Sequence, residues 1–162
     1  MSTHDFAARI FAAQTSHNSK YYSPGDYISV IRDVQCRDNR QGRPMVVFET
    51  EIQQTSSPEH PVGSAATQIY MQDTDAGPGN TKAAIRDILG VTDAQLDDDA
   101  GRAAIIKCLN PDEQTGKSPL AGTVVRVHAI NRPTTKGGNF TLVTFRRAEE
   151  GEKLLTERDS DF

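Results

Sequence analysis

Apolar and polar residues alternate in five stretches of this 162-residue chain, and such alternation predicts β-strands with one buried face. The predicted strands span residues 26–37, 44–53, 64–72, 122–130 and 140–147. Turn-forming residues 38–42 join the first two strands, and the basic segment 132–139 joins the last two. The pattern therefore predicts two hairpins, with a third strand between them.

Alternation also assigns side chains to opposite faces of a strand. Tyr27 precedes the apolar Ile28 in the first strand, and Tyr70 follows the apolar Ile69 in the third. We therefore expect both tyrosine rings to point away from the core.

The last strand carries two phenylalanines, Phe140 and Phe145, and one of them must face the core. Alternation alone does not say which. The other ring is available at the surface.

Helical patterns interrupt the strands between the third and the fourth. The sequence Gly77-Pro78-Gly79 ends extended structure, and Asn80 is a suitable N-cap for a helix over residues 81–89. A second helical stretch is predicted over residues 98–109, preceded by acidic residues that favour a helix N-terminus.

Three strands, a helical insert and two strands are the order of the OB-fold, a barrel that binds oligonucleotides. The predicted fold is mainly β: a five-stranded OB-like barrel with a helical insert between strands 3 and 4 and a disordered acidic C-terminal tail. Residues 1–24 are an N-terminal lead-in, residues 25–148 the nucleic-acid-binding domain, and residues 149–162 the tail. A small sandwich is the alternative for strands of this length.

Charge divides the last third of the chain into two parts. Residues 117–148 contain six basic residues and no Asp or Glu, whereas residues 149–162 contain six acids and two bases. The tail alone accounts for the net charge of −4, so residues 1–148 are close to neutral. This split indicates a polyanion-binding surface with a tail that competes for it or recruits partners. A solvated hairpin with a polar terminus is the alternative.

Other chemistry finds little support in the sequence. Cys36 and Cys108 lie far apart and form no metal-binding pair, which favours reduced thiols and a cytoplasmic protein. No signal peptide or membrane-spanning apolar run is recognisable. No zinc spacing, phosphate-binding loop, calcium loop or catalytic set is complete, so we expect no cofactor, no metal and no enzyme activity.

A surface that binds unpaired nucleic acid needs cations for the backbone and aromatic faces for the bases. The strands and connecting loops offer both kinds of side chain. The predicted nucleic-acid-binding residues are Tyr27, Arg37, Arg40, Arg43, Tyr70, Arg126, His128, Arg132, Lys136 and Phe140.

Several short segments make the chain similar to bacteriophage single-stranded DNA-binding proteins with an OB-fold core. They are Gly25-Asp26-Tyr27, Pro61-Val62-Gly63-Ser64, Gly79-Asn80-Thr81-Lys82, Gly122-Thr123-Val124-Val125-Arg126-Val127 and the acidic end Glu157-Arg158-Asp159-Ser160-Asp161-Phe162. The resemblance implies coating of single-stranded DNA in phage replication or recombination, in the cytoplasm of the host cell. It also implies that Phe162 fills an apolar pocket of a replication or recombination protein while Asp159 and Asp161 meet basic residues around it.

The expected function is therefore binding of single-stranded DNA without sequence preference, with possible homo-oligomers and no membrane partner. In the absence of DNA the acidic tail is expected to occupy the cationic groove. The alternative is a non-enzymatic phage structural or adaptor module that uses the same barrel for protein contacts. An RNA-binding role like that of cold-shock proteins is a third, weaker possibility.

Overall fold

The computed structural model describes residues 19–154. Its strands are β1 (Ser19–Tyr21), β2 (Gly25–Asp38), β3 (Pro44–Thr55), β4 (Ala65–Met71), β5 (Val124–Pro133) and β6 (Asn139–Arg147). Its helices are α2 (Gly77–Leu89), α3 (Asp93–Asp97) and α4 (Asp99–Leu109), all between β4 and β5. The five predicted strands and the position of the helical insert are confirmed. The additional strand, β1, lies in the region predicted to be a lead-in.

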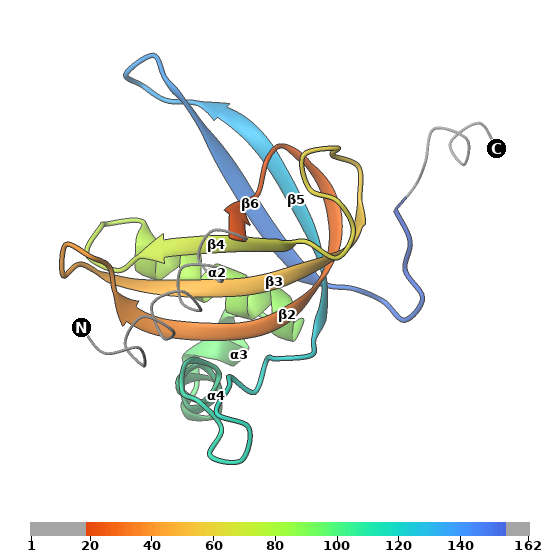
Figure 1. Cartoon of the computed structure of the whole chain (residues 1–162). Helices are drawn as coiled ribbons and strands as arrows, with labels where there is room; N and C mark the ends of the chain where they lie inside the picture. Colours follow the sequence, from red (N-terminus) through yellow and green to blue (C-terminus); the bar gives the residue numbers. More distant parts are fainter. Residues whose placement is uncertain (1–18, 155–162) are drawn as a thin grey trace, which may run out of the picture.

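The six strands form one curled sheet in the order β1-β4-β3-β2-β5-β6, which Figure 1 shows as a half-barrel. β1 runs parallel to β4, and the other neighbours are antiparallel. No ladder joins β4 to β6 within residues 19–154, and β1 pairs with the edge of β4 instead. The prediction of a five-stranded barrel is therefore wrong in its strand count.

Strand β2 lies at the centre of the sheet, between β3 and β5. Its ladder with β3 shifts register between Ile28 and Ser29 and again between Ile31 and Asp33. Such bulges break strict alternation and bend the strand, so consecutive residues become covered. All five residues from Tyr27 to Ile31 are buried.

The expectation that Tyr27 points outward is wrong for this reason. Its side chain is 0% exposed, and its hydroxyl donates a hydrogen bond to the carbonyl of Ser23 at 2.5 Å. The ring packs edge-on against Tyr22, with 5.0 Å between the ring centroids.

Tyr70 is also buried, with 9% exposure, contrary to the prediction from alternation. Its ring meets Phe48 edge-on, with 5.8 Å between the centroids. Helix α2 packs against β4 and β6 and helps to bury this face of the sheet. Alternation correctly placed Tyr70 and Ile69 on opposite faces of β4, but the more deeply buried face is the one that carries Tyr70.

The structure also distinguishes the two phenylalanines of β6. Phe145 is part of the core and lies stacked near Phe48, whereas Phe140 remains exposed. Cys36 is exposed and Cys108 is buried, and both are free thiols.

Helix α2 begins four residues earlier than the sequence predicted. Ala76, not Asn80, is its N-cap, and Pro78 occupies the first turn, where a missing backbone N–H costs nothing. Gly77 is required there because a Cβ atom at this position would lie 1.5 Å from the carbonyl oxygen of Met71. The predicted end at Gly90 is confirmed, since this residue adopts φ 71°.

Helices α3 and α4 have caps made by side chains. Thr92 and Gln95 form a capping box at the start of α3, and Asp98 accepts the N–H of Gly101 at the start of α4. No described helix is long and apolar enough to cross a membrane.

Candidate nucleic-acid interface

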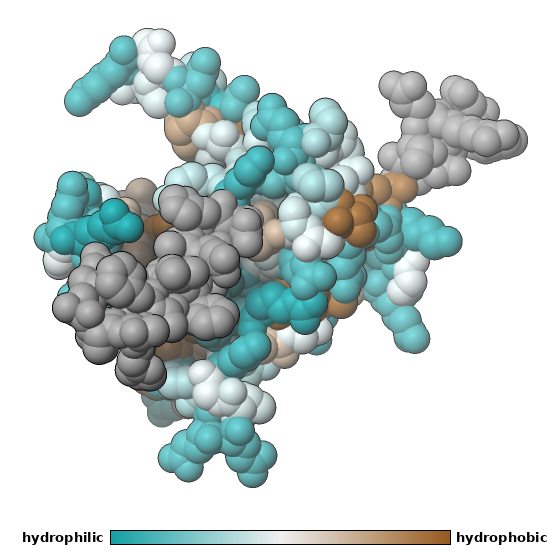
Figure 2. Space-filling model, in the orientation of Figure 1, coloured by the Kyte–Doolittle hydropathy of each residue, from teal (hydrophilic) through white to brown (hydrophobic). Residues whose placement is uncertain are grey.

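The β5–β6 hairpin extends beyond the rest of the sheet as an arm (Figure 1). Its ladder runs without interruption from Val125↔Arg147 to Pro133↔Asn139, and residues 134–138 form the turn. Figure 2 shows a hydrophilic tip, with apolar surface where the arm leaves the body. A regular two-stranded ribbon of this kind presents two faces, each lined by every second residue.

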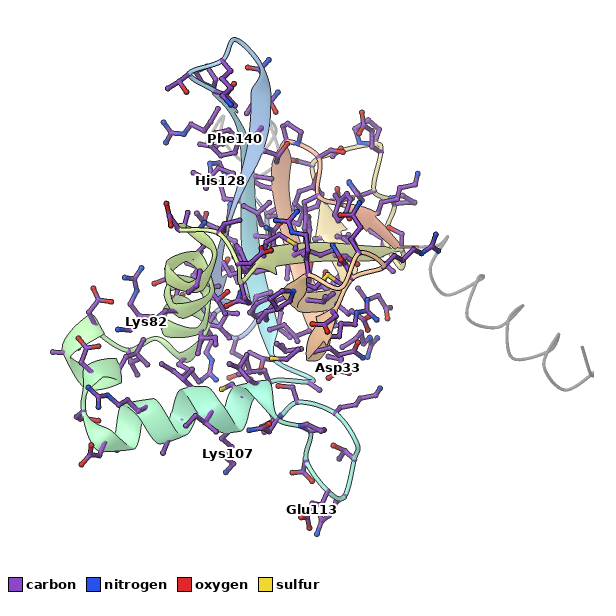
Figure 3. The ribbon with its side chains drawn as sticks, turned by 90° about the vertical axis from the view of Figure 1, so that its left-hand side faces the viewer. Asp33, Lys82, Lys107, Glu113, His128 and Phe140 are labelled. Carbon is purple, nitrogen blue, oxygen red and sulfur yellow. The ribbon has the colours of Figure 1, made fainter. Side chains whose placement is uncertain are left out.

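One face of the arm unites several of the predicted residues. The directly opposed pairs on this face are Arg126↔Arg146, His128↔Thr144, Ile130↔Leu142 and Arg132↔Phe140. Figure 3 shows Phe140 and His128 on the same side of the hairpin. Phe140 is 48% exposed and lies directly across from Arg132, so a cation and an aromatic ring are neighbours at the outer part of the arm.

The inner part of this face is neutralised by acidic groups. Asp26 lies 2.8 Å from His128 Nδ1 and 4.0 Å from Arg126 Nη2. Glu152 receives two hydrogen bonds from Arg146, at 2.8 and 2.9 Å, and a third from Arg126 at 3.3 Å. The Arg146 guanidinium lowers the pKa of Glu152 below its usual range, so this carboxylate stays ionised.

The cations at the outer part of the arm have no such acidic neighbours among the described residues. Arg132 and Lys136 are exposed and have no acidic partner within the described part of the chain. Their charge therefore faces solvent and is available to a polyanion.

The β2–β3 hairpin carries the other predicted arginines. Arg43 makes a two-pronged contact with Asp73, at 2.8 and 3.0 Å, and Arg37 lies 4.0 Å from Glu49. Arg40, at the exposed connection, has no acidic partner among residues 19–154. Only Arg40 of these three is thus free of an internal counter-charge.

Between β4 and β6 the sheet leaves an open seam that holds two adjoining cavities of about 320 and 500 Å³. Both are lined by Gln68, Ile69, Met71, Thr141 and Val143. Phe140 lines the smaller cavity, whereas Asn39 and Tyr21 line the larger one.

Sequence reasoning missed two residues that bear on this surface. Tyr21 is 69% exposed, but the sequence predicts residues 1–24 only as a lead-in, open to an edge strand, a short helix or a dimer arm. The adjacent Tyr21-Tyr22 pair before Ser23-Pro24-Gly25 was the available signal for a short strand. Arg146 was also missed. Alternation places it on the face opposite Phe145, but only the structure shows that Phe145 is the phenylalanine in the core.

The ten predicted residues thus fall into three groups. Arg126, His128, Arg132 and Phe140 share one face of the arm, with Lys136 at its turn. Arg37, Arg40 and Arg43 lie on the other hairpin, whereas Tyr27 and Tyr70 are in the core. Asp159, Asp161 and Phe162 lie outside the described residues.

Residues 19–154 contain no cluster of three or more His, Cys, Asp or Glu side chains placed to hold a metal ion. Comparison of the sequence with models of known protein families and with curated proteins gives no match.

Proposed function

We propose that this protein binds single-stranded DNA without sequence preference, using the β5–β6 arm as its main contact. The strongest support is that Arg132 and Phe140 lie directly opposite each other in the ladder of this exposed ribbon. A cation beside an accessible ring suits one nucleotide unit, since the guanidinium meets the phosphate and the ring stacks on the base.

The order of the elements adds support. The central strand β2 pairs with β3 and β5, β4 follows β3, and the helices separate β4 from β5. This is the connectivity expected of an OB-like barrel, with β1 as an addition, and we propose that the half-barrel is a variant of that fold. In OB-folds, the loops between strands 1 and 2 and between strands 4 and 5 flank the ligand. Here they correspond to the connections that carry Arg40 and Lys136.

In the proposed mechanism, Arg40, Arg132 and Lys136 contact phosphates and release counterions, while Phe140 stacks on a base. Each cation that contacts a single strand contributes about 0.7 to the dependence of log affinity on log salt concentration. Tyr27 and Tyr70 have no part in stacking because both rings are buried.

We further propose that the acidic tail competes with DNA for the arm. Its first part already brings Glu152 onto Arg126 and Arg146, at the inner end of the face that carries Phe140. From the sequence resemblance we also propose that Asp159, Asp161 and Phe162 recruit a replication or recombination protein.

A titration with labelled oligothymidine at several salt concentrations tests the main proposal. The double variant Arg132→Ala/Lys136→Ala is expected to weaken binding at low salt and to reduce the salt slope by about 1.4, which is two contacts. Phe140→Ala is expected to weaken binding by about 1–3 kcal/mol for the base that it no longer stacks.

The matched control is Lys107→Ala/Lys117→Ala, which also removes two exposed cations but at the helical end of the molecule. Figure 3 shows Lys107 far from Phe140. We expect the control to change the salt slope much less. Absence of oligothymidine binding at low salt would contradict the proposal and favour the adaptor alternative.

A further inference from the structure

We propose that the seam between β4 and β6 is a groove for unpaired bases, with Tyr21 as a stacking platform in addition to Phe140. The inference rests on the proposed function and extends it, because it names the part of the ligand that enters the seam. It also restricts the ligand to strands whose bases are free.

The lining of the larger cavity has the chemistry of a base-binding surface. Its described lining contains no charged side chain. It combines the apolar side chains of Met45, Ile69 and Met71 with the amides of Asn39 and Gln68. A phosphate would find no cation there, whereas a base offers an apolar face and a polar edge that match this lining.

Tyr21 lies at this cavity with 69% of its surface exposed. It is the most exposed large hydrophobic side chain in residues 19–154, and an aromatic ring exposed beside an apolar cavity indicates a contact surface. The ring comes from β1, which Figure 1 shows as a short strand beside β4.

Two contacts immediately after Tyr21 fix its backbone. The Tyr22 side chain is buried, and its hydroxyl is hydrogen-bonded to Ser29 at 2.9 Å and to Thr50. The N–H of Ser23 donates to Nε2 of His60 at 3.1 Å. A strand of three residues has little stability alone, so these anchors hold β1 in place before any ligand binds. Such pre-organisation reduces the entropy that is lost on binding.

Cations lie next to the groove rather than in it. Lys20 precedes Tyr21 in the chain, and Arg40 follows Asn39. Both are exposed and have no acidic partner within residues 19–154. The geometry therefore favours bases in the seam and phosphates along its rims.

Three labelled ligands of equal length separate these contributions: oligothymidine, an abasic strand with the same number of phosphates, and a DNA duplex. Tyr21→Ala is expected to weaken oligothymidine binding by about fivefold or more, equivalent to about 1 kcal/mol, and to change abasic-strand binding by less than about twofold. Tyr21→Phe retains the ring and is expected to bind both like the unchanged protein. The duplex is expected to bind weakly, without dependence on Tyr21.

The cation variant Arg132→Ala/Lys136→Ala provides the contrast, because it is expected to weaken oligothymidine and abasic strands alike. Equal losses for both ligands in Tyr21→Ala, or no loss for oligothymidine, would overturn the groove assignment while leaving the proposed function intact. Absence of binding by the unchanged protein to any ligand would overturn the proposed function itself. A thermal unfolding curve of Tyr21→Ala shows whether the exposed substitution leaves the fold intact, and Tyr21→Phe tests the ring independently of folding.

Discussion

At the scale of single residues, the structure separates side chains that are available to a ligand from those that are buried in the core or paired with an internal counter-charge. Phe140 and Tyr21 present aromatic surface to solvent, whereas Tyr27 and Tyr70 are part of the core. Among the cations, Arg132 stays uncompensated within the described residues, but Arg126 is held by Asp26 and Glu152. Residue type alone therefore predicts a candidate binding residue, and the surrounding residues decide whether its side chain is available to a ligand.

His60 provides a prediction at this scale. It is buried beside the rings of Tyr22 and Tyr27, and its Nε2 must stay unprotonated to accept the N–H of Ser23. Burial lowers its pKa below the ordinary value of 6.5, an effect that the nearby Glu59 opposes and Lys20 reinforces. The unfolded chain then binds a proton more readily than the folded one, so stability is complete above about pH 6.5 and falls as the pH decreases towards the lowered pKa.

Denaturant unfolding between pH 7.5 and 5 measures this loss, and the titration of the His60 ring by NMR gives its pKa directly. His60→Gln keeps an acceptor for Ser23 but cannot titrate, so its stability is expected to vary less over the same range. An equal pH dependence in the variant would assign the effect to other groups.

At the scale of elements, local signals predicted the extent of strands well and the helix starts less well. Asn80 is wrong as the predicted N-cap, because Gly77-Pro78-Gly79, which ends extended structure as predicted, also forms the first turn of α2. A helix tolerates Pro in its first turn because the N–H groups there have no intrahelical acceptor. The close approach of Gly77 to Met71 is a tertiary contact that no local pattern reveals.

The two glycines of this turn make a matched pair of substitutions. Gly77→Ala is expected to destabilise the protein by about 1–3 kcal/mol or more, because the added Cβ overlaps the backbone of Met71. A Cβ atom added at Gly79 has no atom within 4 Å, and the residue lies in helical backbone. Gly79→Ala is therefore expected to raise the free energy of unfolding by about 0.4–1 kcal/mol. Denaturant unfolding of both variants checks this, and similar effects at the two positions would contradict the proposed contact.

At the scale of the whole molecule, the tip of the arm and helix α4 lie at opposite ends (Figure 3), and the start of the tail contacts the base of the arm. Gln54 holds this returning segment, since its side chain bonds the carbonyl of Glu152 at 3.4 Å and the N–H of Leu154 at 3.0 Å. Glu152 is thereby fixed over Arg126 and Arg146, two like charges that would otherwise repel one another across the ribbon.

Removal of this carboxylate is expected to strengthen DNA binding if the tail competes with DNA. Glu152→Gln should raise affinity for oligothymidine at low salt and increase the salt slope by about 0.7 for each arginine that then contacts a phosphate. Glu113→Gln, at the helical end in Figure 3, removes the same charge and should have little effect. Weaker binding by Glu152→Gln, or by a protein that lacks residues 149–162, would contradict competition and assign Glu152 a role in supporting the arm.

The sequence by itself determined where five of the six described strands lie, which side chains share a strand face, and how charge is divided between residues 117–148 and the tail. These properties follow from local periodicity and composition, which need no knowledge of distant neighbours. Tertiary structure decided which face is covered, and hence the burial of Tyr27 and Tyr70, the exposure of Phe140 and the place of Tyr21 beside the seam. It also decided which cations keep their charge free, because bulges, strand pairing and ion pairs bring together residues that are distant in the chain.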